Sequence, residues 1–236
     1  MKRFLNILLL LVVAVSLGAC EADLTDFDHK EDEFMIDYGT MLITDGYGSS
    51  NNHYIIRDDG IALLVIRDQG YLYGSSSPIV NGSRVMINYN VMSDLSPFQL
   101  PESCKAGYAI QLNALRSLPC QQAIIGSEPT ATCSPVYVSS AHVGSSYLDL
   151  CFDYKSLDNK KHKFELYCPA PDDPILDLYL IHYGDNDKNN DGQMITSHRI
   201  SFDIEALRGD EPRPFTLHWV GLEGADKGRT GSLNAR

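Results

Sequence analysis

The segment GDNDKNNDGQ, residues 184–193, gathers the side chains best suited to bind a metal ion. Oxygen ligands for calcium recur at alternate positions in it, at Asp185, Asp187, Asn189 and Asp191. Counted from Asp187, the twelfth position is His198, where an EF-hand has a bidentate Glu, so the segment is not an EF-hand. Two interpretations stay open: a calcium loop of another type and a polar hairpin turn. We favour the turn, because Asn, Asp and Gly are common in turns.

A second candidate site is the segment RDQGYLYGSSSP, residues 67–78. Tyr71 and Tyr73 are two residues apart, so in an extended chain both rings project from the same face. A pair of aromatic rings on one face suits a glycan ligand. The alternative, which we favour, is that both tyrosines pack into the core of a β domain.

The sequence lacks the local motifs of the common enzyme classes. It has no Gly-x-Ser-x-Gly elbow, no His-Glu-x-x-His pair and no glycine-rich phosphate loop. Its seven histidines are dispersed, with no local ligand spacing. Carboxylates from distant segments could still meet in the folded chain, which one sequence does not reveal. We therefore expect no enzymatic activity and no cofactor, with calcium as the open possibility.

The first twenty residues have the three parts of a secretory signal. Lys2 and Arg3 give a positive start, residues 8–15 are apolar, and Leu-Gly-Ala leads to Cys20. The Leu-Gly-Ala-Cys pattern resembles the lipobox of bacterial lipoproteins. That resemblance implies cleavage before Cys20 and acylation of the new N-terminal cysteine with three palmitate-type chains, which anchor a protein stably. The alternative is a plain signal peptide with a chance cysteine.

An acidic segment, residues 20–37, follows the lipobox. Its negative charges repel one another and it has little apolar surface to bury, so it predicts an extended, solvated tether.

Loss of Lys2 and Arg3 with the leader takes the formal net charge from −12 to −14, which disfavours a nucleic-acid partner. Such tethers resemble the surface-export signal of lipoproteins in some Gram-negative anaerobes. We expect an outer membrane lipoprotein exposed on the cell surface, with the periplasmic face as the alternative.

Five cysteines remain besides Cys20: Cys104, Cys120, Cys133, Cys151 and Cys168. An odd number in an exported chain leaves at least one free thiol or an intermolecular disulfide. The sequence does not fix their pairing. No Cys-x-x-Cys spacing occurs, so neither a zinc site nor a redox motif is supported.

The apolar runs are short, rich in Ile, Val, Tyr and Leu, and bounded by Gly, Asp, Asn or Pro, which is typical of β-strands. Asp58-Asp59-Gly60 separates two such runs and predicts a hairpin. The segments SSYLDLCFDY and KHKFELYC predict another pair, in which Phe152 lies opposite Phe164. The segment GSEPTATCSP predicts a linker between two β domains.

The chain resembles the NigD-like lipoproteins in a combination of segments. These are the lipobox, RDDGIALLVI, NGSRVMINY, YLDLCFDY and LYLIHYGDN. The resemblance covers nearly the whole mature chain and implies an all-β fold, with an N-terminal OB-like barrel followed by a C-terminal antiparallel β-sandwich. The expected parts are a signal peptide (1–19), the tether with its lipidated cysteine (20–37), the barrel (38–125), the linker (126–135), the sandwich (136–222) and a flexible tail (223–236).

None of the motifs that carry the resemblance is catalytic. We expect a non-enzymatic binding module on a membrane anchor, with a glycan or a protein as its partner. In an OB-type barrel, loops and the adjoining sheet face bind oligonucleotides or oligosaccharides, and the acidic charge disfavours the former. The alternative is an envelope accessory or an immunity-type protein that occludes a toxin.

Overall fold

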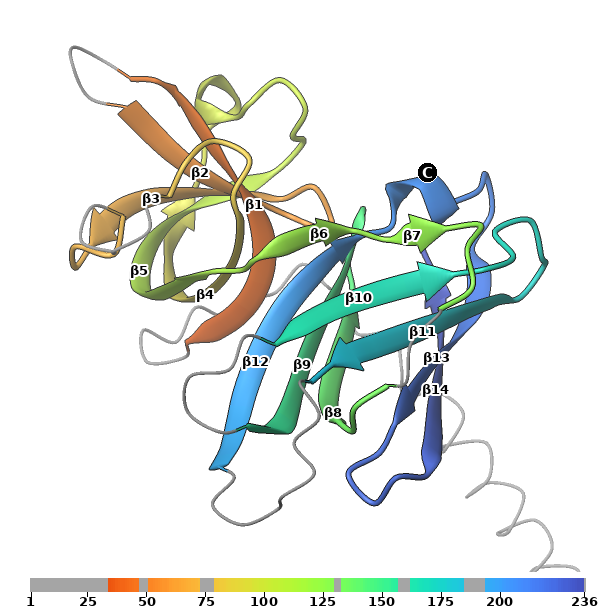
Figure 1. Cartoon of the computed structure of the whole chain (residues 1–236). Helices are drawn as coiled ribbons and strands as arrows, with labels where there is room; N and C mark the ends of the chain where they lie inside the picture. The colour runs from red at the N-terminus through yellow and green to blue at the C-terminus, as the bar shows by residue number, and fades with distance from the viewer. Residues whose placement is uncertain are drawn as a thin grey trace, which may run out of the picture. The chain divides into compact units, whose positions relative to one another are not determined.

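The computed structural model describes residues 34–46, 51–72, 79–129, 133–156, 162–184 and 194–235 (Figure 1). Phe34–Arg236 form one compact unit. Six of the candidate site residues lie outside the described ranges, namely Cys20, Tyr73, Asp185, Asp187, Asn189 and Asp191.

The N-terminal half of this unit is a closed barrel with the strand order β1-β2-β3-β5-β4 (Figure 1). Its strands are β1 (Met35–Asp45), β2 (Asn51–Arg57), β3 (Ala62–Asp68), β4 (Arg84–Asp94) and β5 (Gly107–Ser117). The hairpin predicted at Asp58-Asp59-Gly60 is confirmed, because β2 and β3 pair antiparallel on either side of it. Alternate residues point inward, and the core contains Met41, Ile55, Leu63, Val85, Ile87, Tyr89, Ile110 and Leu112.

The C-terminal half is a β-sandwich of a five-stranded sheet, β14-β13-β11-β10-β7, and a four-stranded sheet, β6-β12-β9-β8. The strands are β6 (Cys120–Gln122), β7 (Ile124–Ile125), β8 (Tyr137–Val143), β9 (Tyr147–Ser156), β10 (Lys163–Cys168), β11 (Leu176–Tyr183), β12 (Met194–Asp203), β13 (Arg213–Val220) and β14 (Asp226–Leu233). The all-β prediction of a barrel followed by a sandwich is confirmed. The sandwich also has parallel pairs, β7 with β10, β6 with β12 and β11 with β13.

Two single 3-10 turns, η1 (Pro97–Gln99) and η2 (Glu205–Leu207), are the helical elements of the described residues. No helix in this part of the chain has the length and apolar character needed to span a membrane.

The predicted pairing of SSYLDLCFDY with KHKFELYC is wrong, although the predicted contact exists. These segments become β9 and β10, which lie in different sheets of the sandwich. The rings of Phe152 and Phe164 meet with their centroids 4.6 Å apart, and both side chains belong to the core between the sheets. Strand alternation places an apolar face inward in either arrangement, so it cannot separate a neighbour in one sheet from a partner across the sandwich.

The structure places the ends of the sandwich differently from the expected boundaries. β6 and β7 already pair with sandwich strands before residue 126. Within the expected linker, Ser134 N–H donates to the carbonyl of His182, 2.7 Å away. In the expected tail, β14 pairs with β13 along its whole length, and Leu233 is fully buried in the core. The sandwich therefore takes up residues from both flanking segments.

Candidate functional site

Arg84 occupies the centre of the most polar buried site in the described residues. It opens β4 of the barrel, and its side chain is 0% exposed. Nη1 of Arg84 donates to Oδ1 of Asp58 and Nη2 donates to Oδ2, both at 2.7 Å. Asp58 directly follows β2, at the turn of the β2–β3 hairpin. The barrel therefore positions both members of a two-pronged ion pair, the geometry in which Arg and carboxylate interact most strongly.

The same guanidinium also contacts the sandwich. Nε of Arg84 lies 3.2 Å from Oδ1 of Asp149 on β9, and Nη2 lies 2.5 Å from Oδ2. Asp149 is 2% exposed, and it also accepts a hydrogen bond from the hydroxyl of Ser201 on β12. One arginine thus joins a carboxylate of the barrel to a buried carboxylate of the sandwich.

Aromatic rings enclose this group. The ring of Tyr147 lies 4.8 Å from the guanidinium carbon of Arg84, and the ring of Tyr38 lies 5.8 Å from it. Tyr38 also stacks on His142 of β8, with the centroids 4.7 Å apart and the planes inclined by 14°. His142 Nε2 is 3.1 Å from Oδ2 of Asp58. We call Asp58, Arg84, His142 and Asp149 the Arg84 cluster.

The electrostatics of the cluster favour its charged form. Burial by itself would raise the pKa of Asp58, but hydrogen bonds from His142 and Arg84 outweigh it and lower the pKa to about 2. Burial would likewise lower the pKa of Arg84, but its hydrogen bonds to Asp58 and Asp149 raise it. Asp58 and Arg84 are therefore both ionised at neutral pH.

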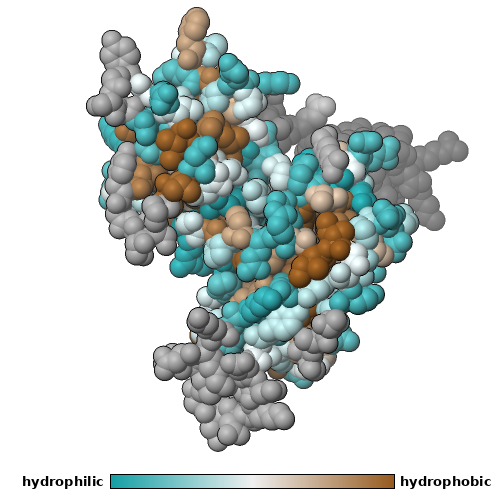
Figure 2. Space-filling model, turned by 45° about the horizontal axis from the view of Figure 1, so that its top comes forward, coloured by the Kyte–Doolittle hydropathy of each residue, from teal (hydrophilic) through white to brown (hydrophobic). Residues whose placement is uncertain are grey.

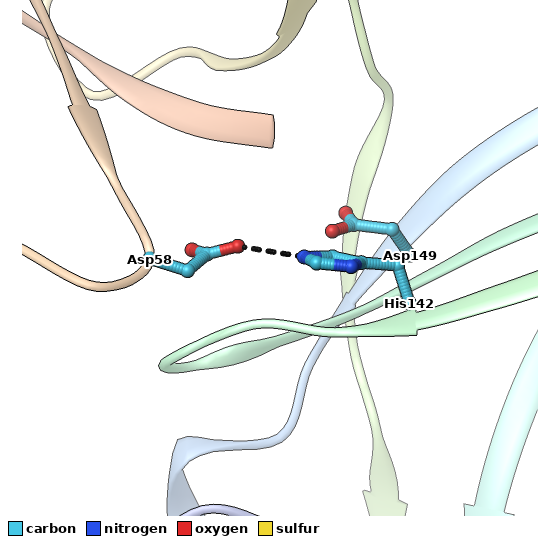
Figure 3. Close-up of side chains that lie close together, drawn as sticks. All are labelled: Asp58, His142 and Asp149. Atoms are coloured by element: carbon cyan, nitrogen blue, oxygen red, sulfur yellow. Dashed lines mark hydrogen bonds and ion pairs between the residues drawn. The ribbon is translucent and has the colours of Figure 1, made fainter. Parts of the chain in front are cut away.

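Three members of the Arg84 cluster have the arrangement of a metal site. The ligand atoms of Asp58, His142 and Asp149 all lie within 4.8 Å of one another, and Figure 3 shows the Asp58 carboxylate directed at the ring of His142. Both carboxylates, however, already bind Arg84 through paired hydrogen bonds. A cation placed between them would meet the positive charge of the guanidinium at a few ångströms. We interpret the cluster as an ionic contact that joins the barrel to the sandwich.

A second buried polar group lies within the sandwich. Nδ1 of His162 and Nε2 of His182 are 2.9 Å apart, and both His182 and His198 stack on Phe164. His182 is 2% exposed. Burial, and then the proximity of His162, lowers the pKa of His182 to about 4, and burial also lowers the pKa of His198. We call His162, His182 and His198 the histidine cluster.

Among the residues proposed from sequence, Tyr71 is described. It is half-buried against the core of the barrel, and its backbone N–H donates to Oδ1 of Asp68 at 2.8 Å. Tyr73 and the four candidate calcium ligands lie outside the described residues, so no spatial arrangement of those candidates follows. The five cysteines whose pairing the sequence left open are free thiols.

Sequence reasoning missed both buried clusters. Asp58 and Asp149 are separated from Arg84 by 26 and 65 positions, so no local spacing connects them. The usable signal is Arg84 itself, a cation in the run SRVMINY that otherwise reads as a half-buried strand. An arginine in such a position requires carboxylates nearby, because an unpaired buried charge is costly.

Comparison with known proteins adds a family to this geometry. Residues 122–227 match the family of the NigD-like C-terminal beta sandwich domain. The sandwich is similar to the NigD-like C-terminal domain. The matched range begins within β6 and ends within β14, so it follows the observed sandwich and includes the segment expected to be a linker. The resemblance inferred from the sequence motifs is thereby confirmed.

Several solved structures share the fold of this chain. A protein described as toxin-related, from Parabacteroides distasonis, is 20% identical with a TM-score of 0.62, over 86% of this chain and 94% of that one. A NigD-like immunity protein from Bacteroides caccae is 19% identical with a TM-score of 0.51, over 84% and 91%. A protein described as a lipoprotein, from Bacteroides fragilis, is 15% identical with a TM-score of 0.52, over 86% and 99%. No curated protein sequence matches this chain.

Proposed function

We propose that this protein is a non-enzymatic lipoprotein of the cell envelope that binds a protein partner, in an accessory or immunity-type role. The lipobox at Cys20 supports the membrane anchor, and the acidic tether supports display on the surface of the outer membrane. The relatives in fold include one named as a NigD-like immunity protein and one described as toxin-related. Occlusion of a protein toxin would be one form of this binding role.

The types of exposed apolar side chain favour a protein over a glycan as the binding partner. Among the described residues, most of the large apolar side chains that are exposed are aliphatic or Met, whereas sugar-binding surfaces rely on aromatic rings. These residues are Ile36, Ile66, Val80, Met92, Ile125, Ile175, Met194 and Ile195, beside the aromatic Phe34, Phe98 and Tyr137. Figure 2 shows apolar surface gathered in two areas of one face, with polar surface between them. Exposed apolar areas of this kind mark protein contacts.

The Arg84 cluster supports a role without catalysis. Among the described residues, its Asp58, His142 and Asp149 have the spacing of a metal site. The two carboxylates, however, are hydrogen-bonded to the buried Arg84. General acid–base chemistry needs a group that can exchange its proton near neutral pH, whereas the pKa of Asp58 is about 2. The cluster therefore serves the fold. The partner is expected to be cationic, because the mature chain has a formal net charge of −14.

Crosslinking on intact cells tests this proposal. The full-length lipoprotein, carrying an affinity tag, is treated with an amine-reactive crosslinker and recovered under denaturing conditions. The expected result is a discrete protein adduct from cells in which the lipoprotein is anchored to the membrane through Cys20. High salt during crosslinking should lower the yield of this adduct. The purified mature domain is also applied to a glycan array. Array binding without a protein adduct would overturn the proposal in favour of a glycan ligand.

A further inference from the structure

The connection between β4 and β5 of the barrel presents one aromatic side chain to solvent. Phe98 is the middle residue of η1 in this connection and is 99% exposed. A phenylalanine so placed makes almost no contact with its own domain. It has no polar atom to hydrate, so its exposure calls for a physical explanation.

The turn that carries Phe98 is fixed locally. The backbone N–H and the hydroxyl of Ser96 donate to Oε1 of Gln99 at 3.0 and 2.8 Å, and the N–H of Gln99 donates to the carbonyl of Ser96 at 2.9 Å. Pro97, at the first position of the turn, fixes its own φ. The backbone on both sides of Phe98 is therefore held in one conformation.

The turn is also anchored on the barrel. The hydroxyl of Tyr54 donates to the carbonyl of Gln99 at 2.7 Å. Leu95 and Leu100, on either side of the turn, pack in a small apolar cluster that contains Tyr54 and Cys104. Leu95 and Leu100 thus fold inward, whereas Phe98 between them does not.

This arrangement lowers the entropy that a partner must overcome. The backbone of Phe98 is already ordered, so binding has only the two side-chain torsions of the ring to fix. The position in the fold agrees with binding, because OB-type barrels use the loop between strands 4 and 5 to contact ligands. A rigid aromatic side chain that fills a pocket is the usual centre of a protein interface.

We propose that Phe98 is the anchor with which the barrel docks into an apolar pocket of a protein partner that has basic side chains around that pocket. This inference rests on the proposed function, namely that the partner is a protein. The exposed Asp94 and Glu102 flank the turn on an acidic chain, which selects a basic rim and opposes an anionic membrane surface. A glycan is disfavoured, because the adjacent polar groups of Ser96 and Gln99 are hydrogen-bonded to each other and not offered to sugar hydroxyls.

The experiment places a photoreactive phenylalanine analogue at position 98 of the full-length lipoprotein in its own cells. Ile175, which lies before β11 of the sandwich and is 56% exposed, provides the matched control position. Irradiation is expected to give an adduct with one protein at position 98 and not at position 175. A lipid or sugar adduct alone at position 98, or no adduct there, would overturn the inference.

A binding measurement then completes the test. The crosslinked partner is purified, and its affinity for Phe98→Ala is expected to fall by roughly 10- to 100-fold, with less than about a 2-fold change for Ile175→Ala. The melting temperature of Phe98→Ala should equal that of the wild type, which separates lost binding from lost folding. Unchanged affinity would refute the anchor. If the amine-reactive crosslinker finds a protein while position 98 does not, the proposed function stands and only this inference fails; if neither does, both fail.

Discussion

The Arg84 cluster and the histidine cluster bury polar side chains in opposite ways. Arg84 remains charged although its side chain is inaccessible to water, because two carboxylates surround the guanidinium. His182 is almost as deeply buried, but its neighbours among the described residues include His162 and His198, and its pKa falls to about 4. Equal burial therefore has opposite effects on charge, and the neighbour decides which one results.

The contrast also assigns the two clusters to different parts of the structure. The Arg84 cluster joins the barrel to the sandwich through residues of β4, β8 and β9 and of the β2–β3 turn. The histidine cluster lies within the sandwich, beside Phe164 of its core. Charged side chains thus connect the barrel to the sandwich, whereas imidazole rings are buried inside the sandwich.

The largest expected effect comes from removal of the cation. Arg84→Met keeps the length of the apolar stem but leaves Asp149 buried without its partner. We expect the free energy of unfolding to fall by about 3–5 kcal/mol, measured by urea denaturation at pH 7. The matched control is Arg57→Met, because Arg57 is also paired with two carboxylates, Asp37 and Asp59, but is 25% exposed. Its cost should be about 1 kcal/mol or less; equal losses for the two variants would remove the distinction.

The next effect is a loss of stability in mild acid that depends on the histidine cluster. The folded-state pKa of His182, about 4, lies below the unfolded value of 6.5, so the unfolded chain binds a proton first as the pH falls. The contribution is complete above pH 6.5 and disappears as the pH approaches 4. Between pH 7 and pH 5 we expect a loss of about 2 kcal/mol in the free energy of unfolding.

His182→Phe is the variant that checks this assignment. It keeps a ring stacked on Phe164 and removes the titrating group. The pH dependence of its unfolding between pH 7 and pH 5 should be flatter than that of the wild type. Asp58 should not contribute in this window, since its pKa is about 2 and its stabilisation is lost only below about pH 4. An equally steep profile in the variant would count against the histidine cluster as the source.

A smaller effect is expected from crowding of the Arg84 cluster. A Cβ added at Gly144, between β8 and β9, would lie 2.8 Å from Oδ1 of Asp58, which is too close for the carboxylate to stay in place. Gly144→Ala should therefore displace Asp58 from Arg84 and lower the free energy of unfolding by about 1–2 kcal/mol. Gly228→Ala is the control, because its nearest neighbour atom would be 3.6 Å away. Denaturation of the two variants side by side gives the comparison.

The smallest expected effect is that of calcium. Both carboxylates of the Arg84 cluster are already hydrogen-bonded to the guanidinium, and the segment at Asp187 lacks the bidentate Glu of an EF-hand. Millimolar calcium should leave the melting temperature of the wild type unchanged, as measured by differential scanning fluorimetry. A rise above about 3 °C that disappears in Asp187→Ala would instead establish a calcium loop.

The parts of the fold that sequence predicted are those with local signals. The β2–β3 hairpin has Asp-Asp-Gly at its turn, and β9 has apolar residues at every second position from Leu148 to Tyr154. β6 and β14 were missed, because an edge strand with mostly exposed side chains has no alternation to read. The partner of β9 was misassigned since the sheet in which a strand lies depends on contacts far along the chain.

The candidate site was less predictable than the fold. The Arg84 cluster needs the barrel and the sandwich to be folded and in contact, and its members come from four separate segments. Phe98 could have been noted as an aromatic in the polar, proline-containing stretch SPFQLP. Its exposure, however, follows from the inward packing of Leu95 and Leu100, which no local pattern specifies.

β6 and β7 have a consequence for the order in which the chain folds. In Figure 1 they follow each other directly, yet β6 adds an edge to one sheet of the sandwich and β7 adds an edge to the other. Their partners are β12 and β10, which lie much later in the chain. All barrel strands have been made once Ser117 is added, so the barrel can close while the rest of the chain is still being synthesised. The sandwich has a high contact order, because its strands pair with partners far along the chain. β6 and β7 therefore stay unpaired until β12 and β10 have been made.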